Sequence, residues 1–158
     1  MILKGIIDTD TINYKKISMV LEFPFCDFKC DKECGQQVCQ NCALATAPSI
    51  DVRPNYIVNK YINNPLTEAI VCQGLEPFDT WESLATIIGY IRTASQDDIV
   101  IYTGYNIDEI FDKVTKLQTH YKNIIIKFGR YIPGQEPHYD EVLGVKLASN
   151  NQYAKRIS

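Results

Sequence analysis

The chain has 158 residues, of which 46% are hydrophobic and 22% are charged, a composition typical of one globular domain that excludes a wholly disordered chain. Sixteen basic and nineteen acidic residues give a net charge of -3, which excludes an overall positive field for binding nucleic acid or an anionic membrane. No apolar run approaches the roughly 20 residues of a membrane span, and acids stand where a signal peptide carries its apolar stretch, so we expect a cytoplasmic protein.

The first predicted strand is followed by a long irregular stretch. Residues 17–23 form a short, mostly apolar run that ends at a proline, with the length and boundary of a buried strand. Residues 24–54 show no sustained apolar period, so we expect a loop there. Later apolar runs with β-branched residues predict three further strands, at 69–72, 99–102 and 123–128.

Segments with a helical period separate these predicted strands. A short helix is expected over residues 54–63, where Pro54 suits the first turn. After the second strand, Asp79 and Glu82 have the spacing of a capping box at the start of an amphipathic helix. The last predicted helix opens at Asn106 and has acids in its first turn, where the helix dipole favours them.

This alternation predicts an α/β fold with a mostly parallel, curved sheet, in the form of a partial (β/α) barrel. We expect a single domain over residues 1–158, with an extended cysteine loop at 24–54. In such folds functional groups gather at the carboxyl ends of the strands, and the cysteine loop leaves the first strand at that end.

Five of the six cysteines lie between Cys26 and Cys42. In a reducing compartment such crowding indicates metal binding more than disulfides. Structural zinc sites usually contain two C-x2-C pairs, whereas here only Cys39 and Cys42 form one. Several cysteines on one short irregular segment suit an iron-sulfur cluster better.

The motifs around these cysteines carry a resemblance to a known family. Cys26 and Cys30 form a Cys-x3-Cys opening directly after a strand, and a Cys-x-Asn segment follows at 39–41. This pattern resembles the radical S-adenosylmethionine superfamily, and within it the activating protein of anaerobic ribonucleotide reductase. Four later segments are similar to that protein in the same order along the chain: 73–77 (QGLEP), 100–105 (VIYTGY), 128–130 (FGR) and 149–152 (SNNQ).

The resemblance implies a 4Fe-4S cluster and S-adenosylmethionine as cofactors. The family loop is C-x3-C-x2-C, but Glu33 stands where the third cysteine would be. The implied cluster ligands are therefore Cys26, Cys30 and Cys39, with Cys34 as the alternative third ligand. The segment 73–77 resembles the family's Gly-Gly-Glu-Pro, which contacts the methionine amino group. The implied cofactor-binding residues are Gln73, Gly74, Leu75, Glu76, Tyr102 and Thr103.

The implied function is that of an activase with no catalytic side chain beyond the cluster. It would generate a glycyl radical on a large anaerobic ribonucleotide reductase subunit, with a flavodoxin- or ferredoxin-type electron donor. Two alternatives stay open: a radical S-adenosylmethionine enzyme acting on a small molecule of the 7-deazaguanine type, and a non-catalytic zinc-loop binding module. No nucleic acid or membrane partner is expected.

The remaining conspicuous residues have ordinary structural interpretations. Cys72 lies among apolar neighbours in a predicted strand and should be a core thiol. His120 and His138 stand among charged and turn residues and should lie at the surface. The pair Asp97 and Asp98 is expected in a solvated turn.

Overall fold

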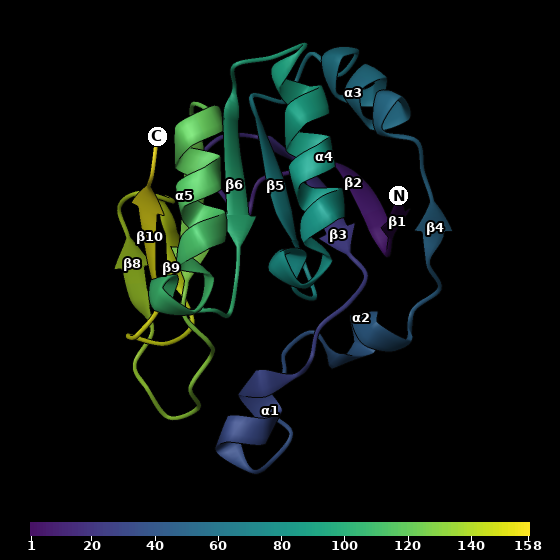
Figure 1. The fold of residues 1–158 in the computed structure, drawn as a ribbon. Helices are drawn as coiled ribbons and strands as arrows, with labels where there is room; N and C mark the ends of the chain where they lie inside the picture. The colour runs from purple at the N-terminus through teal and green to yellow at the C-terminus, as the bar shows by residue number, and fades with distance from the viewer.

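The computed structural model describes residues 1–158 and contains a six-stranded mixed sheet (Figure 1). Its strand order is β10-β7-β6-β5-β3-β2, with the four central strands parallel and the two edge strands antiparallel to their neighbours. The strands are β2 (Gly5–Asp10), β3 (Ser18–Phe23), β5 (Ala69–Gly74), β6 (Asp98–Tyr102), β7 (Ile124–Phe128) and β10 (Tyr153–Arg156). The chain is therefore a mixed α/β domain.

Three helices cover one face of this sheet (Figure 1). They are α3 (Pro54–Ile62), α4 (Trp81–Arg92) and α5 (Phe111–His120), with the 3₁₀ turns η1 (Pro77–Thr80) and η2 (Ile107–Ile110) leading into the last two. Each helical connection moves the chain from one parallel strand to its immediate neighbour, in the order β3, β5, β6, β7. All four predicted strands are present, and so are the three predicted helices.

Side chains of the central strands alternate between two apolar layers, as the period of two requires. Residues such as Leu21 and Ile101 pack beneath the helices in a core of 22 buried residues. Residues on the opposite face, such as Val71 and Val100, pack against Leu143 and against a small hairpin. That hairpin consists of β8 (His138–Asp140) and β9 (Val145–Leu147).

The predicted strand at residues 17–23 is present, but it is not the first strand of the chain, because two others precede it. The short strand β1 (Ile2–Leu3) pairs with β4 (Ile50–Asp51), and β2 then forms the edge of the main sheet. Most of β2 is exposed or half-buried, so it lacks the apolar run that marks a buried strand.

The stretch 24–54 is also more ordered than predicted. It contains two short helices, α1 (Lys29–Cys34) and α2 (Cys42–Thr46), besides β4. Neither helix has a buried residue, so neither carries the apolar period that would reveal it. In Figure 1 α1 projects beyond the carboxyl ends of the parallel strands.

The two predicted helix caps have different outcomes. The capping box at Asp79 and Glu82 is wrong, because α4 begins after Thr80 without a side-chain cap. The Asp79 carboxylate instead accepts hydrogen bonds from the Asp27 N–H at 3.1 Å and the Tyr105 hydroxyl at 2.5 Å. The predicted start at Asn106 is confirmed. Asn106 and Glu109, three residues later, form a capping box there.

The prediction of a solvated turn is wrong for Asp98. This residue begins β6 and is only 7% exposed. Its carboxylate can be buried because three donors form hydrogen bonds with it. It accepts hydrogen bonds from the Tyr14 hydroxyl at 2.9 Å, Lys16 Nζ at 2.8 Å and Arg156 Nη2 at 2.8 Å. Asp97, in contrast, is exposed.

Other single-residue predictions can be compared directly with the structure. Cys72 is fully buried in the helix-covered core, as predicted. His120 is exposed, whereas His138 is half-buried in β8. None of the helices combines the length and apolarity that crossing a membrane requires.

Candidate functional site

A cavity of about 380 Å³ lies at the carboxyl ends of the parallel strands. Each of the four strands contributes one polar residue near its end: Glu22, Gln73, Tyr102 and Lys127. The register pairs Glu22 with Gln73 and Tyr102 with Lys127, and it pairs Cys72 with Ile101 one residue earlier in β5 and β6, so the four form a row across the sheet.

This row continues the sheet face that the helices leave free. Alternation places it on the same face as Val71 and Val100, two residues earlier in their strands. The β8–β9 hairpin covers the apolar part of that face, and Val145 and Leu147 form part of the cavity wall. The carboxyl half of the face is thus lined by polar side chains.

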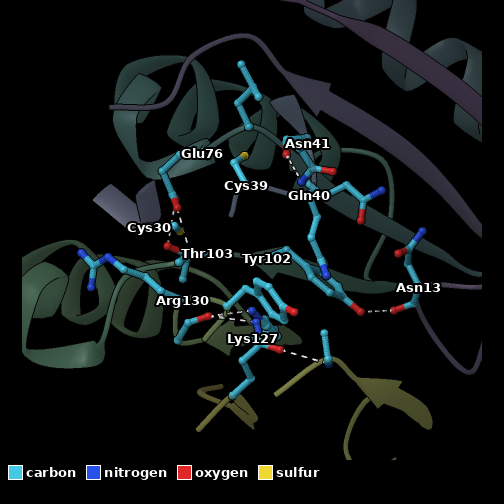
Figure 2. Close-up of a pocket in the computed structure, with 18 of the residues that line it drawn as sticks. Asn13, Cys30, Cys39, Gln40, Asn41, Glu76, Tyr102, Thr103, Lys127 and Arg130 are labelled. Atoms are coloured by element: carbon cyan, nitrogen blue, oxygen red, sulfur yellow. Dashed lines mark hydrogen bonds between the residues drawn. The ribbon is translucent and has the colours of Figure 1, made fainter. Parts of the chain in front are cut away.

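Glu76 is the most enclosed acid of the site. It is 5% exposed and accepts hydrogen bonds from the Thr103 hydroxyl at 2.8 Å, the Gly104 N–H at 2.9 Å and the Phe78 N–H at 3.1 Å (Figure 2). Burial raises the pKa of Glu76 to about 7, although the three hydrogen bonds oppose this shift. The carboxylate is therefore held in one orientation by neutral donors alone.

Lys127 brings a buried ammonium group to the same cavity. It is 7% exposed, and its Nζ donates to the Gly129 carbonyl oxygen at 2.8 Å. Burial lowers the pKa of Lys127 to about 8, with the negative charge of Glu76 opposing the shift. Figure 2 shows Lys127 on the side of the cavity beside Tyr102.

Three cysteines form part of the cavity wall: Cys26, Cys30 and Cys39. Cys34 and Cys42 are half-buried and do not line it. Burial raises the pKa of Cys26 to about 12 and also raises the pKa of Cys30 and Cys39. Thiols in such surroundings need the positive charge of a metal to become thiolate ligands.

Local hydrogen bonds fix the positions of these cysteines. The Asp31 carboxylate accepts from the backbone N–H groups of Val38 and Cys39, both at 2.8 Å. The Cys26 sulfur accepts from the Phe28 N–H at 3.3 Å. Phe28 has a φ of 55°, so the chain turns sharply between the first two cavity cysteines.

The spacing of the sulfurs bears on the kind of metal. The only three potential ligand atoms within 4.8 Å of one another come from Cys26, Asp27 and Asp79. A single zinc ion with bonds of about 2.3 Å would need its sulfur ligands about 4 Å apart. The sulfurs of the three cavity cysteines are not all within 4.8 Å of one another, so they do not form a single-zinc site as they stand.

The cysteine loop is attached to the end of β5. The side-chain Nδ2 of Asn41 donates to the Gly74 carbonyl oxygen at 2.9 Å. Gly74 has a φ of +106°, and a Cβ there would lie 2.7 Å from the backbone nitrogen of Phe23. Only glycine permits this turn and this close approach of β3 and β5.

Arg130 links α1 to η2, the turn that leads into α5. Its guanidinium binds Glu109 through two nitrogens at 2.8 and 2.7 Å, and its Nε lies 3.5 Å from Glu33 in α1. Hydrogen bonds from Arg130 lower the pKa of Glu109 to about 2, and the pair keeps both groups charged. Cys30 stands in the same short helix as Glu33.

The two C-terminal motifs meet at the cavity. Gln152 lines it and donates through Nε2 to the Gly129 carbonyl oxygen at 3.2 Å. The Asn151 side chain donates to the Arg130 carbonyl oxygen at 2.8 Å. Asn150, in contrast, is exposed and does not line the cavity.

The structure thus gathers the expected site residues around one cavity. The six expected cofactor-binding residues line it together with the three cysteines: Gln73, Gly74, Leu75, Glu76, Tyr102 and Thr103. The Tyr102 hydroxyl donates to the Asn13 carbonyl oxygen at 2.6 Å. Sequence reasoning missed Glu22 and Lys127. Each is a polar residue in a strand that is otherwise mostly apolar, on the sheet face that the helices leave free.

Comparison with protein families decides the kind of metal group. Residues 17–153, most of the chain, match the family model described as a 4Fe-4S single cluster domain. The chain belongs to this family. No curated protein and no solved structure was found to match it.

The site of this 4Fe-4S single cluster domain fits its cluster. Three soft thiol donors at separated positions on one cavity wall are the donor set that iron-sulfur clusters use. Membership of the family favours an iron-sulfur cluster over the zinc-loop alternative.

Proposed function

We propose that this 4Fe-4S single cluster domain is a radical S-adenosylmethionine activase. It would generate a glycyl radical on a large anaerobic ribonucleotide reductase subunit, in the cytoplasm, with a flavodoxin- or ferredoxin-type electron donor. The observation that carries the proposal is that three cysteines and a buried glutamate line the same cavity at the strand ends.

The proposed cluster ligands are Cys26, Cys30 and Cys39. Support comes from the cavity wall, which includes these three and not Cys34. Further support comes from Asp31, whose carboxylate holds the backbone of Cys39. Three ligands on a four-iron cluster leave one iron available to the amino and carboxylate groups of S-adenosylmethionine.

We also propose that the fold is a partial (β/α) barrel. Neighbouring parallel strands in sequential order, with all three connecting helices on one face, have the winding of a partial (β/α) barrel. In that class the chemistry takes place at the carboxyl ends of the strands, where the cavity lies.

Cys26, Cys30 and Cys39 would hold the cluster, which would supply the electron for reductive cleavage of S-adenosylmethionine and so for hydrogen abstraction from the glycine Cα of the partner. The chain's own residues bind and orient the cofactor. The Glu76 carboxylate, which Thr103 and Gly104 hold in place, would accept a hydrogen bond from the amino group of the cofactor. The wall formed by 73–75 would exclude water from the methionine end.

Anaerobic reconstitution tests this proposal. Protein prepared without oxygen should contain about four irons per chain. With dithionite it should convert S-adenosylmethionine to methionine and 5'-deoxyadenosine, and Cys26→Ala should not. Mixed with the reductase, the wild type should produce the paramagnetic signal of a glycyl radical. Cofactor cleavage without that signal, but with consumption of a small molecule, would favour the 7-deazaguanine-type alternative.

A further inference from the structure

Asp79 is a carboxylate beside the cavity cysteines that the proposed reaction does not use. It stands in η1, the turn that follows β5, and is half-buried. One of its oxygens, the Cys26 sulfur and a carboxylate oxygen of Asp27 all lie within 4.8 Å of one another. Asp79 does not line the cavity, so contact with a ligand bound there does not explain its position.

Two hydrogen bonds fix this carboxylate. Its Oδ2 accepts from the Asp27 N–H at 3.1 Å, and its Oδ1 accepts from the Tyr105 hydroxyl at 2.5 Å. Two cations lie over the ring of Tyr105, at 4.4 and 5.4 Å from its centroid: Lys29 and Arg130. Because Asp27 directly follows Cys26, Asp79 holds the backbone next to that cysteine.

Asp79 is negative without an ion pair. No cation of the chain lies within 4.0 Å of its oxygens. Neighbouring acids are paired: Asp27 lies 3.7 Å from Lys29 Nζ, and Glu109 binds Arg130 through two nitrogens. Both donors to Asp79 are neutral, so its charge stays uncompensated beside the Cys26 sulfur.

Nearby charge is one of the factors that set the reduction potential of an iron-sulfur cluster. Reduction adds one electron, so a carboxylate close to a cluster ligand opposes it and lowers the potential. A cluster of low potential is a strong electron donor, as reductive cleavage of a sulfonium requires.

We propose that Asp79 is a positioning residue for Cys26 and that its fixed negative charge lowers the reduction potential of the cluster. This inference rests on the proposed function through the assignment of Cys26 as a ligand. It deepens that function, because it assigns a residue outside the cavity to the control of electron transfer.

The test is a redox titration of the anaerobically reconstituted protein without S-adenosylmethionine, followed by the paramagnetic signal of the reduced cluster. Asp79→Asn removes the charge but keeps an oxygen for the Asp27 N–H and an amide group for the Tyr105 hydroxyl. The equilibrium constant for one-electron reduction should rise about tenfold, which raises the midpoint potential by about 59 mV. Iron content and the thermal unfolding midpoint should match the wild type.

Two variants serve as controls. Asp79→Glu keeps the charge, so its reduction equilibrium should stay within about threefold of the wild type. Asp112→Asn removes one negative charge from an exposed position in the first turn of α5, outside the cavity. Solvent screens that charge, so the reduction equilibrium should again change less than about threefold.

Three results would overturn the inference and leave the proposed function standing. The first is an unchanged or lower potential in Asp79→Asn. The second is an equal rise in Asp112→Asn, which would mean that only the net charge of the chain matters. The third is an Asp79→Asn protein that no longer assembles the cluster, because the carboxylate would then serve assembly and not the potential. A wild type without a four-iron cluster would remove the inference and the proposed function together.

Discussion

The side-chain amide of Asn41 donates a hydrogen bond of 2.9 Å to the carbonyl oxygen of Gly74. This contact joins the cysteine loop to the end of β5 across 33 positions of sequence. Cys39 stands two residues before Asn41, and Glu76 stands two residues after Gly74. This hydrogen bond therefore helps to place a proposed cluster ligand and the buried glutamate relative to each other.

Asn41→Ala should weaken cofactor binding while leaving the cluster in place. Loss of one hydrogen bond of this kind costs about 1 kcal/mol, so the affinity for S-adenosylmethionine should fall about fivefold. Equilibrium dialysis of the anaerobic protein measures this change. Gln40→Ala is the matched control, because Gln40 lines the same cavity without this hydrogen bond, and an equal loss in both variants would contradict the assigned role.

The two candidate third ligands should respond differently to mutation. Cys39→Ala should lose most of the iron, because it removes a thiol from the cavity wall. Cys34→Ala should keep the wild-type iron content, because Cys34 lies at the end of α1 and does not line the cavity. Iron and sulfide analysis after anaerobic purification measures both, and the reverse pattern would assign Cys34 as the ligand.

Gly74→Ala should lower the stability of the fold. A Cβ at this position would lie 2.7 Å from the Phe23 nitrogen, in a backbone conformation that side chains disfavour. Gly35→Ala is the matched control, because its φ is +66° but nothing lies within 4 Å. The free energy of unfolding should fall by about 1 kcal/mol in Gly35→Ala and by roughly 3 kcal/mol in Gly74→Ala. Equal losses in urea unfolding would exclude the close approach as the cause.

Glu76 should make the stability of the ligand-free protein depend on pH. Burial raises its pKa from the ordinary 4.5 to about 7, so the folded chain binds this proton more tightly than the unfolded chain. Its contribution to the free energy of unfolding therefore falls as pH rises from about 4.5 to about 7, by about 3 kcal/mol, and is constant above that.

Glu76→Gln removes this titration and leaves a constant offset from the altered hydrogen bond to Gly104. The difference in unfolding free energy between wild type and variant should therefore change across this pH range and be level above it. Urea unfolding at pH 5, 6, 7 and 8 measures the difference. A difference that is flat throughout would show that Glu76 titrates at its ordinary value in the folded chain.

The central sheet was predictable because the patterns that mark its strands and helices lie within short stretches of the sequence. Each buried strand is a short apolar run, and each crossover helix has an apolar face of period 3.6, so both give strong signals. The elements that were missed give none: β2 is an exposed edge strand, and α1 and α2 bury no residue. Their positions depend on tertiary contacts such as the bond from Asn41.

The part of the candidate site that lies in motifs was predictable from the sequence. The cysteines and the segment 73–76 came from motif resemblance, and the structure gathers them at one cavity. Lys127 was not predicted as a site residue, because it is a single polar residue within the apolar run 123–128. Its significance follows from alternation across four strands, which places it in a row with Glu22 and Tyr102 only when the register is known.

The central claim is that the cluster has three cysteine ligands and an iron open to S-adenosylmethionine. The most direct measurement is the electron paramagnetic resonance spectrum of the reduced, anaerobically reconstituted protein before and after S-adenosylmethionine is added. We expect a changed cluster spectrum in the wild type and in Cys34→Ala. An identical spectrum with and without the cofactor, from a cluster of about four irons, would contradict it.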